Sequence, residues 1–465
     1  MEKIKCSEVI EATGGKLVSG NCDTDFVNVS TDSRTIKENE LFIPIRGEKF
    51  DGHDFIEDAL KAGAAGVLAQ RDINAGLKER FSDRAVIRVE DTLKALRDLA
   101  KYYRSKFRIP FVGITGSVGK TTTKDMIASV LMQEYKVLKT EGNFNNEIGL
   151  PLTVFNLDSS HEAAVLEMGM NALGEISRLT AIARPRIAVI TNIGLAHIGK
   201  LGSRQNILKA KMEILEGVPK DGLVVLNGDD SLLYGLKGFL DRRTVYYGMG
   251  EELDYQAYNI KNAGEAGVYF DINIKGREYK IHVPLPGVHN VYNALAAIAV
   301  GIELGIPAEK IARGIESFSS AKMRLNIVFL NGIKIINDAY NASPQSMEAA
   351  LRVLKDMKDA KSSGRKIAVL GDMLELGEWS YNSHYNIGKF AVSLGIDYII
   401  TVGENAKAIS EGAIQAGALP ERVKWFTNNE EAAEFLNQIL HPEDIVLVKG
   451  SRGMKMEEIV QRLTK

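Results

Sequence analysis

Cysteine is scarce in this chain, with only two in 465 residues, Cys6 and Cys22. Two thiols do not make a disulfide framework, and no Cys-x-x-Cys spacing of a metal or redox site is present. The first residues, Met1 to Cys6, lack the apolar segment of a signal peptide. These absences predict a protein of the reducing cytoplasm.

Long hydrophobic runs and an excess of one charge are also missing. The longest smooth apolar run, Ala294 to Ile302, is far shorter than the ~18 residues that suggest a membrane span. The formal net charge is −2, whereas proteins that bind nucleic acid usually carry a strong basic excess. We therefore expect no membrane span and no nucleic-acid partner. The 45% of hydrophobic and 25% of charged residues are typical of a folded globular protein.

The length is too great for one hydrophobic core and predicts two to four domains. From Pro110 onward, short β-branched runs such as Ile187–Ile190 and Leu223–Leu226 alternate with helical stretches. Such alternation predicts a parallel sheet with helices on both faces, and it resumes after Met323. We expect three α/β domains. They are a small N-terminal domain over residues 1–106, a central P-loop-type parallel-sheet domain over 107–320, and a Rossmann-like domain over 321–465.

The most informative stretch is a glycine-rich loop between a buried strand and an amphipathic helix. It reads Gly113-Ile114-Thr115-Gly116-Ser117-Val118-Gly119-Lys120-Thr121-Thr122. In such loops backbone N–H groups and a helix N-terminus face phosphate oxygens. Lys120 would reach the β- and γ-phosphates of ATP, and Thr121 would place a hydroxyl on Mg²⁺. Because Ile114 stands where the common pattern has glycine, a ligand-free glycine turn is the alternative.

With Ile114 at this position, the loop resembles the ATP-binding loop of the Mur ligases and of their folylpolyglutamate synthase relatives. Further matches to Mur ligases lie in all three predicted domains. They are Ser30–Arg34, Asn143–Pro151, Glu167–Ile176, Lys209–Ile214, Leu285–Ala294, Met323-Arg324, Asn337–Pro344, Gly371–Gly377 and Lys449–Arg452.

The resemblance implies a magnesium site built from Thr121, Glu167, His197 and Lys211. Glu167 would bind Mg²⁺ and His197 would help to hold a second ion. Lys211 matches a lysine that is carbamylated in several Mur ligases, which turns an ammonium into a carboxylate-like ligand for a hard cation. Taken alone, these are a strand-end glutamate, a polar loop histidine and a solvated helical lysine.

The resemblance also implies nucleotide contacts from two domains. Asn290 would lie by the adenine, although asparagine is also a good N-cap for the helix that begins there. Arg324 would reach the phosphates and Asp338 the ribose. Since these residues and Lys120 belong to different predicted domains, we expect ATP to close them on each other.

The Asn143–Pro151 and Glu167–Ile176 segments resemble the branch of the family that adds D-alanyl-D-alanine. The implied substrates are that dipeptide and UDP-N-acetylmuramoyl-tripeptide. For Arg34, an Asp–Arg pair of structural value is nearly as good an interpretation as diphosphate binding. The residues expected to contact the substrates are Ser33, Arg34, Asn145, Asn146, Asn341, Ser343 and Lys449.

The implied activity is ATP-dependent amide ligation through an acyl phosphate. Both nucleophiles come from the substrates, which agrees with the absence of a Gly-x-Ser-x-Gly or cysteine nucleophile motif. One alternative is a family member that adds another amino acid or acts on folate. A second is a regulator that binds ATP without turnover. We expect a monomer.

Overall fold

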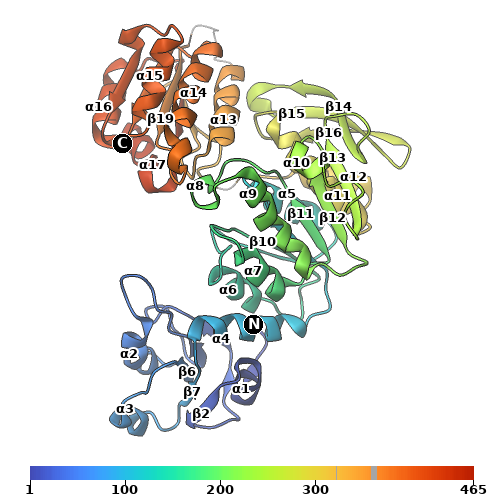
Figure 1. Cartoon of the computed structure of the whole chain (residues 1–465), viewed down its shortest axis with the longest axis vertical. Coiled ribbons are helices and arrows are strands. Elements are labelled where there is room, and N and C mark those ends of the chain that lie inside the picture. The colour runs from blue at the N-terminus through green and yellow to red at the C-terminus, as the bar shows by residue number, and fades with distance from the viewer. Residues whose placement is uncertain (321, 358–363, 465) are drawn as a thin grey trace.

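The computed structural model describes residues 1–320, 322–357 and 364–464; the predicted boundary residue 321 lies outside them. Figure 1 shows an N-terminal α/β unit at one end, a central unit in the middle and a C-terminal α/β unit at the other end. Each unit has its own sheet. The three-domain α/β architecture is thereby confirmed, while the boundaries themselves stay a prediction.

The N-terminal unit is a small sheet with strand order β2-β7-β6-β5-β4 beside a two-stranded ribbon of β1 and β3. Neighbours from β4 to β7 run parallel, and β2 pairs antiparallel with β7. Its elements are β1 (Ile4–Lys5), α1 (Cys6–Thr13), β2 (Lys16–Ser19), β3 (Asp25–Phe26), β4 (Asn28–Ser30), β5 (Glu40–Phe42), α2 (Ile56–Lys61), β6 (Gly66–Ala69), α3 (Ala75–Arg80) and β7 (Ala85–Arg88).

Helix α4 (Thr92–Ser105) connects this unit to the central one. The Asp91 carboxylate caps it by accepting a hydrogen bond from the Lys94 backbone. Its apolar face packs on α6 (Gly149–Phe155) and α7 (Glu175–Ala183) of the central unit. The buried Tyr103 hydroxyl donates to the Leu157 carbonyl at 2.6 Å, so this junction is both apolar and hydrogen-bonded.

The central unit is a nine-stranded sheet with order β16-β15-β14-β13-β12-β11-β8-β10-β9. Its strands are β8 (Phe111–Thr115), β9 (Val137–Lys139), β10 (Ala163–Glu167), β11 (Ile187–Ile190), β12 (Leu223–Asn227), β13 (Arg243–Gly248), β14 (Tyr255–Asn262), β15 (Val268–Ile274) and β16 (Arg277–Val283). Its helices are α5 (Lys120–Leu131), α6 (Gly149–Phe155), α7 (Glu175–Ala183), α8 (Ile198–Leu201), α9 (Arg204–Met212), α10 (Ser231–Tyr234), α11 (His289–Glu303) and α12 (Ala308–Glu316).

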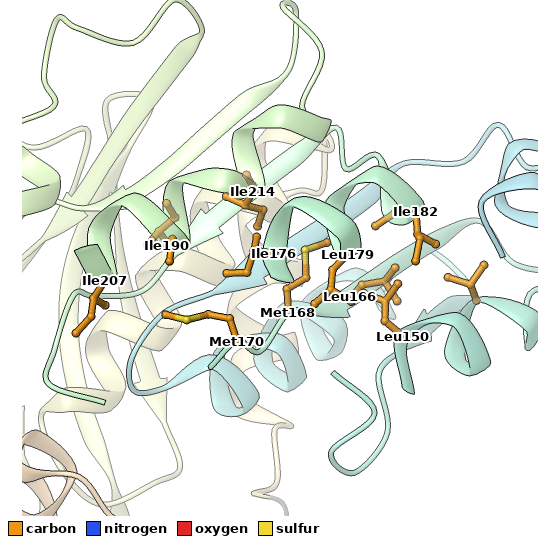
Figure 2. Packing of buried hydrophobic residues seen from close by; sticks show 14 of the residues in the cluster. Leu150, Leu166, Met168, Met170, Ile176, Leu179, Ile182, Ile190, Ile207 and Ile214 are labelled. Carbon is orange, nitrogen blue, oxygen red and sulfur yellow. The ribbon is translucent and has the colours of Figure 1, made fainter. Parts of the chain in front are cut away.

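Two apolar layers sandwich this sheet, as the alternation of strands and helices predicted. One face packs against α5, α11 and α12. The other carries side chains such as Leu166 and Ile190 that pack against Ile176 and Leu179 of α7 (Figure 2). The parallel strands β8, β10 and β11 are adjacent. Their carboxyl ends therefore meet at one edge of the sheet, where ligands bind in such folds.

The strands β14, β15 and β16 differ from the predicted parallel pattern, because they form an antiparallel extension of the sheet. Residues of β15 alternate between buried and exposed, which suits a sheet with one solvated face. Lys275 and Gly276 have φ of 53° and 83°, the backbone of a tight hairpin turn. This turn, rather than a crossover helix, reverses the chain.

The C-terminal unit has strand order β17-β18-β22-β19-β20-β21, parallel except for the β17–β18 pair. Its strands are β17 (Asn326–Leu330), β18 (Ile333–Asn337), β19 (Lys366–Gly371), β20 (Tyr398–Val402), β21 (Val423–Phe426) and β22 (Ile445–Lys449). Its helices are α13 (Pro344–Asp356), α14 (Ser380–Ser393), α15 (Lys407–Gln415), α16 (Asn429–Ile439) and α17 (Glu457–Leu463), with a 3₁₀ turn η4 (Gly377–Trp379). In the part of the chain that the structure describes, no helix has the length and apolarity needed to cross a membrane.

Candidate active site

The glycine-rich loop lies between β8 and α5, as the motif predicted. Gly119 is the N-cap of α5 with φ 84°. The first N–H groups of a helix have no partner within the helix, and here they face the cavity described below. The Lys120 ammonium donates to the Gly116 carbonyl at 2.9 Å, and desolvation lowers its pKa. This terminus suits a polyphosphate, whose charge would favour the protonated lysine.

A second segment supports this loop from behind. The Asn192 carbonyl and side-chain oxygen accept the Ser117 and Val118 N–H groups at 3.0 and 2.9 Å. The Thr191 hydroxyl donates to the Val118 carbonyl at 2.6 Å. A Cβ on Gly116, whose φ is 153°, would lie 1.8 Å from the Thr191 hydroxyl oxygen. Sequence reasoning missed this supporting role, although the Thr191-Asn192 pair directly follows β11.

Glu167 ends β10 with its carboxylate buried and held on both oxygens. The Thr121 hydroxyl donates to Oε2 and the Asn145 amide donates to Oε1, each at 2.8 Å. The Glu167 N–H donates to the Thr140 hydroxyl at 3.0 Å. Two neutral donors keep a carboxylate oriented without neutralising its charge. The predicted metal carboxylate therefore lies beside the phosphate loop, and Asn145 acts here as its partner.

Lys211 is buried in α9, with an exposed fraction of only 2%. No carboxylate among the described residues is within ion-pair distance of its ammonium. Desolvation, reinforced by the charge of Lys120, holds its pKa well below the usual value. A solvated helical lysine, the alternative interpretation, is therefore excluded. Burial of this kind favours the neutral form of the amine.

His197 lies between the phosphate loop and the C-terminal unit. Its Nδ1 is 2.5 Å from the Glu375 Oε2, although the ring nitrogen is not aligned for a hydrogen bond. Desolvation lowers the pKa of His197, against the opposing charge of Glu375 and with the help of Lys120 and Lys211. The imidazole is therefore mainly neutral near pH 7, which is the form that binds a metal. Sequence reasoning named the Glu375 segment but assigned it no role.

Arg324 reaches from the C-terminal unit into the central one. Its Nη2 donates to the Thr121 hydroxyl at 3.0 Å, and its guanidinium lies 4.2 Å from the centre of the Tyr340 ring. The neighbours Met323 and Leu325 have φ of 59° and 51°, which bulky side chains rarely adopt. Arg324 is thus directed at Thr121 of the glycine-rich loop, and its contact with a phosphate stays a prediction.

Asp338 and Lys449 are paired at the ends of β18 and β22. The Lys449 ammonium donates to Asp338 Oδ2 at 2.6 Å and to the Asn341 carbonyl at 2.9 Å. Ser343 is the N-cap of α13. Desolvation lowers the pKa of His289, which is near Asp338 and Lys449, to about 4. Lys449 therefore holds the Asp338 segment in place.

Asn290 is buried at the start of α11, and its amide donates to the Pro286 carbonyl at 2.9 Å. Asn293 donates to the Asn290 side-chain oxygen, and its own oxygen accepts the Thr123 hydroxyl of α5, both at 2.9 Å. A Cβ on Gly119 would come within 3.0 Å of that Asn293 oxygen. The two asparagines thus join α11 to the phosphate loop.

A cavity of about 470 Å³ collects most of the predicted residues between the central and C-terminal units. Those that line it are Ser117, Val118, Gly119, Lys120, Thr121, Thr122, Asn145, Asn146, Glu167, His197, Lys211, Asn290, Arg324, Asp338, Asn341, Ser343 and Lys449. Thr115 and Gly116, at the start of the glycine-rich loop, are not among the lining residues. A shallow hollow of about 540 Å³ between α16 and α17 contains none of these residues.

Ser33 and Arg34 do not line this cavity. The Arg34 side chain is 86% exposed and pairs with Asp32 at 2.7 Å. Hydrogen bonds from Arg34 lower the pKa of Asp32 to about 2. The structural Asp–Arg pair that the sequence left open is thus formed, and both residues remain accessible from solvent. Asn146 accepts the Ile148 and Gly149 N–H groups through its side-chain oxygen, so only its amide nitrogen is available to a substrate.

The side chains around Glu167 suit Mg²⁺ on the condition that Lys211 carries a carbamate. Among the described residues no three His, Cys, Asp or Glu side chains gather as metal ligands. Glu167 is the carboxylate that contacts Thr121, and Lys211 as a free amine adds no oxygen. A carbamate on Lys211 would supply two oxygens of the kind that Mg²⁺ prefers and would give this buried side chain a partner.

Comparison with family models covers most of the chain. Residues 25–104 match the model "Mur ligase family, catalytic domain", 114–301 match "Mur ligase middle domain", and 323–452 match "Mur ligase, glutamate ligase domain". The order of these matches follows the three units of the structure.

Named relatives match over the full length. The chain is 42% identical over 465 residues to UDP-N-acetylmuramoyl-tripeptide--D-alanyl-D-alanine ligase of Bacillus subtilis, covering 100% of this chain and 99% of that one. It is 32% identical to the Escherichia coli enzyme of the same name, with 100% and 99% covered.

Solved structures of MurF also resemble this chain in overall fold. MurF of Acinetobacter baumannii superposes with a TM-score of 0.91 at 32% identity, covering 100% of this chain and 99% of that one. MurF of Thermotoga maritima in complex with ADP gives 0.82 at 29% identity, with 94% and 97% covered.

Proposed function

This chain belongs to the Mur ligase family, and from that premise we propose that it joins D-alanyl-D-alanine to UDP-N-acetylmuramoyl-tripeptide. It is an ATP-dependent ligase that forms a carbon–nitrogen bond, and its product is the UDP-linked pentapeptide of peptidoglycan synthesis. The observation that carries the proposal is the gathering of Lys120, Glu167, Lys211 and Arg324 around one cavity. The full-length relatives of this activity support the choice of substrates.

The reaction has two steps, and the substrates supply both nucleophiles. The carboxylate of the tripeptide attacks the γ-phosphorus of ATP, which gives an acyl phosphate and ADP. The amine of D-alanyl-D-alanine then attacks the acyl carbon, loses a proton and expels phosphate. The protein's contribution is to hold the reacting atoms together and to neutralise phosphate charge.

The α5 N-terminus, Lys120 and Arg324 would neutralise the negative charge of the phosphates. Lys120 would exchange its bond with the Gly116 carbonyl for the β- and γ-phosphates. Arg324 would stabilise the transferring group when the C-terminal unit closes, since its guanidinium already reaches Thr121 at 3.0 Å. Asn290 would lie by the adenine and Asp338 by the ribose.

Mg²⁺, held by Thr121 and Glu167, would screen the negative charge of ATP, and His197 and a carbamylated Lys211 would hold a second ion. The oriented carboxylate of Glu167 and the lowered pKa of Lys211 support this assignment. A neutral amine adds to carbon dioxide with loss of a proton, which yields the carbamate.

Substrate contacts come from the outer parts of the cavity and from the N-terminal unit. Asn145, Asn146, Asn341, Ser343 and Lys449 would position the tripeptide and the dipeptide. Ser33 and Arg34 would bind the diphosphate of the UDP group. We further propose that the enzyme works as a monomer in the cytoplasm.

The direct test is ADP release with ATP, Mg²⁺, UDP-N-acetylmuramoyl-tripeptide and D-alanyl-D-alanine, each omitted in turn, with the product weighed by mass spectrometry. We expect pentapeptide only when all four are present. A product that contains glutamate or a diamino acid in place of the dipeptide would refute the substrate assignment. ATP binding without ADP release under any condition would favour a regulator.

Replacing Arg34 by alanine tests the UDP site. If Arg34 leaves Asp32 and binds the diphosphate, the KM for the UDP-substrate should rise about 10- to 100-fold in the alanine variant, because charge-assisted hydrogen bonds to the diphosphate are lost. The kcat should change little, since Arg34 is not near the reacting atoms. Steady-state kinetics with Arg80→Ala, another exposed arginine paired with a carboxylate, is the control. Equal KM values in both variants would leave Arg34 as a surface ion pair.

A further inference from the structure

The central and C-terminal units meet at a backbone contact beside the cavity. The Gly199 N–H of α8 donates to the Glu375 carbonyl at 3.1 Å. A Cβ on Gly199 would lie 2.7 Å from the Gly377 nitrogen, and one on Gly377 would lie 3.0 Å from the Gly199 Cα. Both positions thus need glycine for the segments to approach this closely. Figure 1 shows α8 of the central unit next to the C-terminal unit, where η4 is the segment that contacts α8.

The backbone on both sides of this contact is unusual. His197 and Glu375 each have φ of 64°, in the left-handed region that side chains other than glycine, asparagine and aspartate rarely adopt. Such conformations persist where surrounding contacts hold them, and they cluster at functional sites. In this case they direct two side chains from different units at each other.

The side-chain contact leaves one imidazole nitrogen free. His197 Nδ1 is buried 2.5 Å from Glu375 Oε2, while the Lys200 ammonium is 4.0 Å from the other carboxylate oxygen. Nε2 has no hydrogen-bond partner among the described residues and is not among their buried polar atoms. Since His197 also lines the cavity, Nε2 is the nitrogen that a ligand can reach.

We propose that Glu375 is a positioning residue that orients His197 from the opposite unit, so that docking of the C-terminal unit completes the ligand geometry at Nε2. A carboxylate beside Nδ1 fixes the proton there and leaves the lone pair on Nε2 for a metal. This inference rests on the metal role proposed above for His197.

The consequence is that closure and metal binding depend on each other. Arg324 and Glu375 are carried by the same unit, so the docking that brings a cation to the phosphates also fixes the imidazole. A protein with an undocked C-terminal unit would hold the second ion weakly. ATP would therefore not be activated before the C-terminal unit is in place.

The experiment uses the full chain with Mn²⁺ in place of Mg²⁺ and a non-hydrolysable ATP analogue. Pulsed electron paramagnetic resonance detects a ¹⁴N nucleus bonded to Mn²⁺, and a titration gives the Mn²⁺ affinity. The variants are Glu375→Gln, His197→Gln and the double variant. The control is Glu378→Gln, which changes an exposed carboxylate three residues away that forms no ion pair among the described residues.

We expect nitrogen coupling in the unmodified chain and in Glu378→Gln, and its loss in His197→Gln. In Glu375→Gln the Mn²⁺ affinity and kcat should fall about 10- to 100-fold, as for other residues that orient a metal-binding histidine, while the KM for ATP stays unchanged. The Mn²⁺ affinity and kcat of the double variant should be no lower than those of His197→Gln, because both substitutions act on the same metal–imidazole contact.

Two outcomes would overturn the inference. One is an unmodified chain without nitrogen coupling; the other is Glu375→Gln with the coupling and affinity of Glu378→Gln. Failure of the proposed reaction is separable, because the spectroscopic measurement needs no turnover. A chain that makes no pentapeptide but shows the Glu375-dependent coupling would refute the substrate assignment alone.

Discussion

Lys120→Met is expected to lower kcat by at least about 1,000-fold while leaving the melting temperature no lower. The ammonium is the cation of the phosphate loop, and removing one preorganised charge or donor from a transition state costs on the order of 10²–10³ or more in rate. The stability should hold because desolvation lowers the pKa of Lys120 in the folded protein. A lowered lysine pKa means that folding disfavours the charged form, so loss of the charge removes a cost.

Activity and thermal unfolding, measured on the same preparations, check this prediction. Lys101→Met, which removes an exposed lysine of α4, is the control and should match the unmodified chain in both. A Lys120→Met variant with normal turnover would refute phosphate binding at this loop. One that unfolds at a much lower temperature would show instead that the lysine serves the fold through its bond to the Gly116 carbonyl.

Lys211→Ala is expected to lower activity about 10²–10³-fold, and short carboxylic acids such as formate or acetate should restore part of it. Lys211 is buried and lies without a carboxylate partner among the described residues, so its neutral form can take up carbon dioxide. The alanine variant leaves space for a small carboxylate where the carbamate would be. For the same reason, activity should fall in buffers depleted of carbon dioxide and return when bicarbonate is added.

The modification can be observed without turnover. In ¹³C-bicarbonate the unmodified chain should give a carbamate resonance in the NMR spectrum, and Lys211→Ala should lack it. Lys209→Ala is the matched control, since Lys209 lies on the same helix but is exposed. A carbamate signal absent from the unmodified chain, or full activity of the unrescued Lys211→Ala variant, would remove the carbamate from the mechanism.

Much of the fold could be predicted from periodicity and from glycine placement. The predicted strands Ile187–Ile190 and Leu223–Leu226 agree with the structure to within a residue. The antiparallel strands β15 and β16 were missed, because their alternation is a local pattern that many surface strands share. The turn at Lys275 and Gly276 pairs β16 with β15, and β15 takes its place beside β14 through the separate turn at Gly264–Ala266.

The candidate site was predicted unevenly for a similar reason. Lys120 and Thr121 stand in one continuous motif, whose local backbone dictates their direction. Asn192, Glu375 and Tyr340 act through partners far away in the chain, and no spacing in the sequence links them to those partners. Arg34 is the opposite case, because its partner Asp32 is only two residues away. The sequence alone could therefore offer the structural Asp–Arg pair as an alternative.

The sequence by itself determined the class of chemistry, because the loop Thr115–Thr122 has the residue types and spacing of a phosphate-binding loop and the segments around Glu167 and Lys211 resemble those of Mur ligases. Only the tertiary structure decided which of these side chains share a cavity, which oxygen of Glu167 each neighbour holds, and that Lys211 is buried with a lowered pKa. Burial and long-range contacts arise when separate units pack together. The state of Lys211, and the meeting of His197 with Glu375, are therefore properties of the packed domains and not of any one segment.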